Sequence, residues 1–69
     1  MKKVKLDTKD IKVTPALINT LTHICNTDSN VDFNKITVFK NHISISFNWV
    51  KDGNTDSIFN KLNSKLKLF

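Results

Sequence analysis

Residues 31–51 alternate apolar and polar side chains, and this pattern constrains the fold more than any other feature of the chain. In the second half of the segment, apolar Ile43, Ile45, Phe47 and Trp49 alternate with polar Ser44, Ser46 and Asn48. Such a period of two is typical of a strand with one buried face. A two-residue turn at Lys40 and Asn41, with Asn41 at positive φ, would pair Val38 with Ile43 and Ile36 with Ile45. The segment therefore predicts a β-hairpin whose two strands share one apolar face.

A helix is predicted before this hairpin, because Thr14 and Pro15 form a strong start signal. Thr is a favoured N-cap, and Pro at the first helical position has its φ already set. The predicted helix runs to about Cys25, with Leu17, Leu21 and Ile24 on one side.

A second helix is predicted after Asp52 and Gly53, capped by Asn54 or Thr55. Its apolar stripe consists of Ile58, Phe59, Leu62 and Leu66. At the other end of the chain, residues 2–6 and 10–13 both alternate polar with apolar side chains, so each is a candidate strand.

The order of these elements predicts an α+β fold in a single domain, residues 1–69. We expect a small two-layer structure, in which the central hairpin 31–51 and an N-terminal strand form an antiparallel sheet. Both helices carry one apolar stripe, so both are expected to pack on one face of that sheet.

The cysteine count and the hydropathy pattern bear on location. Cys25 is the only cysteine, so no internal disulfide can form, and a lone cysteine is most often a small buried hydrophobe in a reducing compartment. The sequence has no apolar run near 18 residues and no hydrophobic segment after its charged N-terminus. A cytoplasmic location is expected, which means the host cytoplasm if a phage encodes the protein.

The choice of charged residues is unusual. All basic residues are Lys and all acidic residues are Asp; Asn is frequent, and Arg, Glu, Gln and Tyr are absent. This bias indicates an A/T-rich coding sequence, as in low-GC bacteria and their phages and mobile elements. The net charge is +5, and the excess of Lys lies towards both ends of the chain, which favours acidic partners there.

No pattern for catalysis or for a metal is found. The candidate metal donors are His23, Cys25, Asp28 and His42, and His-x-Cys is not a usual zinc spacing. Paired carboxylates at a useful spacing and nucleophile motifs are absent, and a single glycine cannot build a phosphate-binding loop. We therefore expect a protein that is not an enzyme and that has no cofactor and no metal.

The second face of the predicted hairpin is the most distinctive candidate surface. Strict alternation places on it Val31, Phe33, Lys35, Thr37 and Phe39 from one strand and His42, Ser44, Ser46, Asn48 and Val50 from the other. Three interpretations remain open: the face is covered by the N-terminal segment or by a second copy of the chain, it docks on another protein, or it binds nucleic acid.

These observations favour a small non-enzymatic regulatory protein that docks on another macromolecule, in the first place a protein. Inhibition of that partner is one outcome of such docking, and activation is the other. The predicted contact residues are Phe33, Lys35, Phe39 and His42, with Lys61 and Lys65 of the last helix as a second group. The alternative is a nucleic-acid-binding module that uses the Lys-rich termini and the aromatic sheet face. A homodimer is compatible with both, and no membrane partner is expected.

Overall fold

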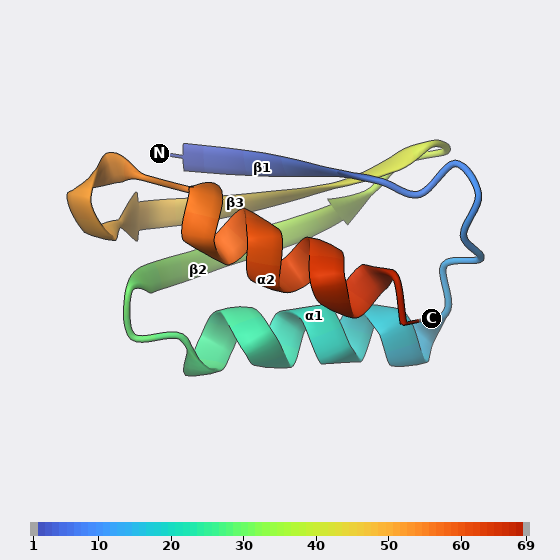
Figure 1. Cartoon of the computed structure of the whole chain (residues 1–69), viewed down its shortest axis with the longest axis horizontal. Coiled ribbons are helices and arrows are strands. Elements are labelled where there is room, and N and C mark those ends of the chain that lie inside the picture. Colours follow the sequence, from blue (N-terminus) through green and yellow to red (C-terminus); the bar gives the residue numbers. More distant parts are fainter. Residues whose placement is uncertain (1, 69) are drawn as a thin grey trace.

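The computed structural model describes residues 2–68 and shows a three-stranded antiparallel sheet with two helices (Figure 1). Its elements are β1 (Lys2–Asp7), α1 (Pro15–Thr27), β2 (Val31–Val38), β3 (His42–Val50), a short 3-10 segment (Lys51–Gly53) and α2 (Asp56–Leu66). The strand order is β1-β3-β2, so β3 lies at the centre and pairs with both neighbours.

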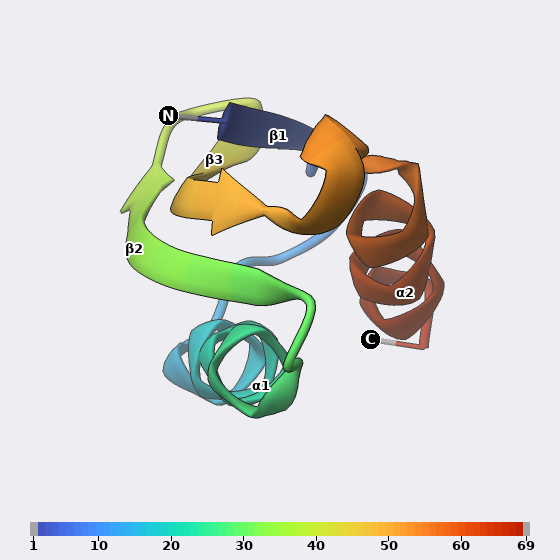
Figure 2. The ribbon, with the colours of Figure 1, turned by 90° about the vertical axis from the view of Figure 1, so that its left-hand side faces the viewer.

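Both helices pack on the same side of the sheet (Figure 2). α1 lies against β2, α2 lies against β1, and the two helices contact each other. The buried side chains between the two layers come from every helix and strand, and the largest of them is Phe47. The predicted α+β fold is therefore confirmed.

The predicted start of α1 is confirmed, since Thr14 Oγ1 accepts a hydrogen bond from the Leu17 backbone N–H at 3.2 Å. The helix extends to Thr27, two residues beyond the predicted end. Leu17, Leu21 and Cys25 are buried along its inner side. These residues are spaced four apart, which places them on one stripe of a helix.

A tight turn directs the chain from β3 into α2. Asp52 (φ 58°) and Gly53 (φ 66°) both have positive φ, and the Asn54 N–H donates to the Lys51 carbonyl at 3.3 Å. This is a type I′ turn, for which Asp-Gly is a preferred pair. Of the two predicted caps, Thr55 is the N-cap of α2 but makes no side-chain capping bond. The Asp56 N–H donates instead to Oδ1 of Asn54, the residue before the cap, at 2.9 Å.

The hairpin has the predicted register near its turn. Val38 pairs with Ile43, Ile36 pairs with Ile45, and the Phe39 N–H donates to the His42 carbonyl at 2.8 Å. The predicted positive φ at Asn41 is wrong, because Asp52 and Gly53 are the residues with positive φ among those described. The loop of Lys40 and Asn41 closes the hairpin without a left-handed residue.

Far from the turn, two register shifts break the alternation that the sequence suggested. Asp32 pairs with Trp49, Phe33 with Phe47, and Lys35 with Ser46, so the extra residues are Asn48 in β3 and Asn34 in β2. Each extra residue moves the following side chains to the other face of the sheet.

This change of face corrects four predicted positions. Val31, Phe33 and Val50 lie on the helix side, where both valines are buried and Phe33 packs against the core. Trp49 is 51% exposed and does not belong to the core.

Residues 10–13 are not a strand, which corrects the prediction of a second N-terminal strand. The chain from residue 8 to residue 14 has no regular structure, and the Thr8 N–H donates to the Asn41 carbonyl at 3.0 Å. Ile11 and Val13 pack partly against the core. Their alternation with polar residues therefore reflects apolar contacts rather than strand pairing.

Candidate functional site

The side of the sheet opposite the helices is a continuous polar surface, which we call the open face. It consists of Lys3, Lys5 and Asp7 of β1, Asp32, Lys35 and Thr37 of β2, His42, Ser44, Ser46 and Trp49 of β3, and Phe39 of the hairpin loop. Within residues 2–68 no helix or loop lies over this face (Figure 2). Of the interpretations that the sequence left open, cover by the N-terminal segment is excluded, because that segment is the edge strand β1.

The pairing register arranges the open face in rows across the three strands. Lys3, Ser46 and Lys35 form one row. Lys5, Ser44 and Thr37 form the next, and Asp7 pairs with His42 at the hairpin end. The hydroxyl groups therefore lie along the central strand, and the lysines flank them on both edges.

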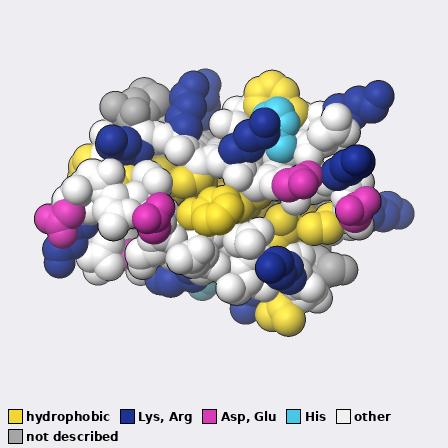
Figure 3. All heavy atoms as spheres, turned by 45° about the horizontal axis from the view of Figure 1, so that its top comes forward, with side chains coloured by type: hydrophobic (Ala, Val, Ile, Leu, Met, Phe, Trp, Pro, Cys, Tyr) yellow, Lys and Arg dark blue, Asp and Glu magenta, His cyan; other side chains and the backbone are white. Residues whose placement is uncertain are grey.

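Positive charge dominates the middle of the open face, since Lys3, Lys5 and Lys35 are all exposed there. The two carboxylates lie at its ends: Asp32 Oδ2 accepts a hydrogen bond from Asn48 Nδ2 at 3.2 Å, and Asp7 Oδ1 accepts from the Lys9 N–H at 2.9 Å. Figure 3, which turns the β1 side forward, shows lysine side chains along the upper edge of the molecule, around an exposed hydrophobic side chain and a histidine.

Aromatic side chains lie at both ends of the open face. Trp49 is 51% exposed at one end and Phe39 is 48% exposed at the other. The Phe39 ring is stacked on His42, with 4.6 Å between centroids and 15° between planes. Six residues of β3 lie between His42 and Trp49, which corresponds to about 23 Å along a strand.

The bulge at Asn34 is held by a side chain of the open face. Ser46 is nearly fully buried, its Oγ donates to the Lys35 carbonyl at 3.4 Å, and it accepts from Asn34 Nδ2 at 3.4 Å. These two bonds join the bulged segment of β2 to the centre of β3.

The structure brings three of the six predicted contact residues together: Lys35, Phe39 and His42 lie on the open face. Phe33 does not, which corrects the prediction. Its ring lies 6.5 Å from that of Phe47 at 67°, in an edge contact on the helix side, because the shift at Asn34 turned it there.

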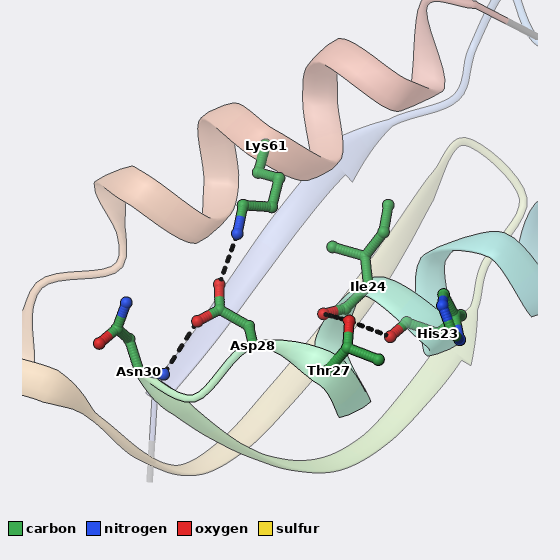
Figure 4. Close-up of polar contacts among 6 residues, drawn as sticks. All are labelled: His23, Ile24, Thr27, Asp28, Asn30 and Lys61. Carbon is green, nitrogen blue, oxygen red and sulfur yellow. Dashed lines mark hydrogen bonds and ion pairs between the residues drawn. The ribbon is translucent and has the colours of Figure 1, made fainter.

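Lys61 and Lys65 lie on α2, on the opposite side of the sheet from the open face. Lys61 Nζ is 3.0 Å from Asp28 Oδ2, and this carboxylate also accepts a hydrogen bond from the Asn30 N–H at 2.9 Å (Figure 4). The backbone N–H of Asn30 and, after it, the Lys61 ammonium lower the pKa of Asp28. Lys61 therefore ties α2 to the loop after α1.

Sequence reasoning missed Lys3, Lys5 and Trp49. The alternation of residues 2–6 predicted a strand, but its place beside β3, which brings the two lysines to the open face, depended on the strand order. No signal in the sequence identified the two bulges, apart from an Asn at each of them.

Other chemistry-bearing groups form no second site in the described part of the chain. No group of three His, Cys, Asp or Glu residues among residues 2–68 is placed to hold a metal ion. Cys25 is buried, and desolvation, followed by the nearby charge of Asp28, raises the pKa of its thiol to about 11.

Comparison of the chain with protein-family models, with curated proteins and with solved structures finds no match. Within residues 2–68, none of the helices has the length and apolar character needed to cross a membrane.

Proposed function

We propose that the protein binds single-stranded nucleic acid on its open face. The observation that carries this proposal is the arrangement of three exposed lysines on both sides of the central strand, with an exposed aromatic side chain at each end. Proteins that bind single strands combine the same two elements, a positive surface for phosphates and aromatic rings for bases.

The lysines supply the electrostatic part of binding. Lys3, Lys5 and Lys35 extend from both edge strands, so a chain of phosphates that runs along β3 meets positive charge on either side. Each lysine is a point charge without the planar fork of arginine, which suits phosphate contacts better than bidentate contacts to base edges. This part of the interaction is therefore expected to tolerate many sequences.

The aromatic side chains favour an unpaired strand over a duplex. Trp49 and the Phe39–His42 stack offer ring faces on which bases can lie. In a duplex these base faces are stacked on one another and are not accessible. A single strand exposes them, and stacking contributes about 1–3 kcal/mol for each base.

The composition of the open face argues against a protein partner, which the sequence alone favoured. Lys and Ser are depleted in the cores of protein interfaces, yet they form the centre of this face. The exposed apolar side chains Trp49 and Phe39 are separated by two polar rows and form no contiguous apolar patch. Docking on a protein and pairing with a second copy are therefore outcomes to be tested against nucleic-acid binding.

Trp49 provides a direct assay, because it is the only Trp and the chain has no Tyr. The protein would be titrated with oligo-dT, with oligo-U and with a duplex of equal length, and the quenching of Trp49 fluorescence would be measured. We expect a dissociation constant of about 1–100 µM for the single strands at physiological salt. Three phosphate contacts give a slope of about −2 for log K against log salt concentration.

Two triple variants locate the interface. Replacement of Lys3, Lys5 and Lys35 by Gln should abolish measurable binding. Replacement of Lys9, Lys65 and Lys67 by Gln removes the same charge from outside the open face and should leave most of the affinity. A larger loss in the second variant would place the interface near α2, and a flat salt response would contradict the proposal.

Light scattering at the titration concentrations separates the remaining alternatives. A dimer whose Trp49 is protected from a soluble quencher would show that a second copy occupies the open face. A monomer that binds none of the three nucleic acids would leave a protein partner.

A further inference from the structure

A pocket opens at the hairpin end of the open face, beside the Phe39–His42 stack. It has a volume of about 420 Å³ and is lined by Lys5, Asp7, Asn41 and His42. These four residues come from the edge strand, the hairpin loop and the central strand. The pocket differs from the lysine-rich middle of the open face because it contains the Asp7 carboxylate.

The pocket contains both hydrogen-bond donors and hydrogen-bond acceptors. Asp7 Oδ1 accepts the Lys9 N–H, and Asp7 Oδ2 has no hydrogen-bond partner among residues 2–68. Lys5 contributes an ammonium donor on the same face of β1, two residues away, at about 7 Å between Cα atoms. Asn41 adds an amide, which can both donate and accept.

The Lys5–Asp7 pair matches the Watson–Crick edge of guanine better than that of any other base. Guanine presents two adjacent donors, N1–H and the N2 amino group, next to the O6 acceptor. A carboxylate accepts from such donors, and an ammonium donates to such an acceptor. Adenine and cytosine each offer a single amino donor beside a ring acceptor, and thymine and uracil place a carbonyl on each side of their one N–H.

His42 gives the pocket an aromatic wall. One face of its ring is covered by Phe39 at 4.6 Å. A base in the pocket therefore meets the other face or the edge of the ring, in a position fixed by this stack. Stacking on aromatic side chains is the usual way in which an unpaired base is held while its edge is recognised.

We propose that this pocket binds one guanine of a bound single strand, with Asp7 accepting from N1–H and the N2 amino group and Lys5 donating to O6. The inference rests on the proposed function, since the lysines and aromatic side chains of the open face hold the rest of the strand. It adds a preference for one base at one position.

The test measures the affinity of the full chain for an oligo-dT of about nine nucleotides, a length within the usual site size. In a second set of oligonucleotides, dG replaces dT at each position in turn, and in a third set deoxyinosine, which lacks the N2 amino group, does so. We expect the best-placed dG to raise the affinity about tenfold, as a good bidentate contact does. Deoxyinosine should lose most of this gain.

Asp7→Asn is the informative variant, and Asp10→Asn is its control. The Asn amide oxygen can still accept the Lys9 N–H, so the local turn is kept. Both variants remove one negative charge and should bind oligo-dT slightly more tightly. Asp7→Asn should abolish the preference for dG, and Asp10→Asn, which lies outside the pocket, should keep it.

The failure of this inference is distinguishable from the failure of the proposed function. Equal affinities for dG and dT oligonucleotides, together with binding that depends on the open-face lysines, would overturn the guanine pocket alone. A dG preference that survives Asp7→Asn would overturn it as well. No binding of any oligonucleotide would overturn both.

Discussion

The two sides of β3 are built from alternating residues of one nine-residue strand, yet they have opposite properties. On the helix side, Ile43, Ile45 and Phe47 are completely buried. On the open face, Ser44 is half-buried and carries a hydroxyl between Lys5 and Thr37 of the two edge strands. The difference shows that the two helices supply enough apolar surface to cover one side of the sheet, and within residues 2–68 the other side is left uncovered.

The largest expected effect is a difference in stability between substitutions at two neighbouring residues of β3, one on each side of the sheet. Ile45→Ala should lower the free energy of unfolding by about 2–5 kcal/mol, because it leaves a cavity in the core. That is a large fraction of the roughly 3–10 kcal/mol expected for a domain of this size. Ser44→Ala should change it by less than about 0.5 kcal/mol. Urea unfolding measures both, and equal losses would show that the open face is packed after all.

Phe33 and Phe39 sharpen the comparison, since the sequence alone placed both on one face. Phe33→Ala should destabilise the fold by about 1–3 kcal/mol, less than for a fully buried Phe, and leave oligonucleotide binding unchanged. Phe39→Ala should cost less than about 1 kcal/mol of stability and weaken binding about fivefold or more. Thermal unfolding and fluorescence titration of both variants decide the matter, and the reverse pattern would restore the original assignment of Phe33.

The Asp28–Lys61 pair tests whether the helix side depends on a polar contact at its margin. Asp28→Asn should lower stability by about 1–2 kcal/mol at pH 7, because it weakens the bonds to the Asn30 N–H and to Lys61. Lys61→Gln should cost less than about 1 kcal/mol, since the lysine side chain is half exposed.

The pH dependence of this pair has a definite sign. The pKa of Asp28 is lowered in the folded state, so the folded protein binds the proton less well than the unfolded chain. The stabilisation is complete above the ordinary pKa of 3.8 and is lost as the pH falls through the folded value. In acid titrations of stability, the wild type should therefore show a steeper loss than Asp28→Asn, and parallel curves would contradict this assignment.

Cys25 has the smallest expected effect, because its thiol is neutral at physiological pH in both states. In the unfolded chain the Cys25 thiol has its ordinary pKa of 9.0, whereas in the folded protein its pKa is about 11. Stability is therefore lost as the pH rises from about 9 to 11. Compared with Cys25→Ala, the wild type should lose additional stability at alkaline pH. Its thiol should react with thiol reagents only when the protein unfolds. Rapid labelling of the native protein would mean that the interior beside α1 is open.

Much of the fold was predictable because the signals are local. Thr14 and Pro15 predicted the start of α1, and the apolar spacing of Leu17, Leu21 and Ile24 predicted its inner side, where Leu17, Leu21 and Cys25 are buried and Ile24 is partly buried. The pairing of Val38 with Ile43 followed from a two-residue loop. Half of the predicted contact residues were placed correctly for the same reason, since Lys35, Phe39 and His42 lie close to that loop, before either bulge.

The sequence by itself therefore determined the order of the elements, the two amphipathic helices and the hairpin near its turn, because capping and periodicity depend on neighbouring residues. Only the tertiary structure decided which side chains form the open face. Lys3 and Lys5 reach it because β1 pairs with β3 across some forty intervening residues, a contact that no local pattern encodes. Trp49 reaches it, and Phe33 leaves it, because the shifts at Asn48 and Asn34 let Val31 and Val50 be buried against the helices. Burying apolar side chains between the sheet and the helices stabilises the fold more than a strictly alternating strand pair would. That gain exists only once the two layers are packed together, so a local sequence pattern does not reveal it.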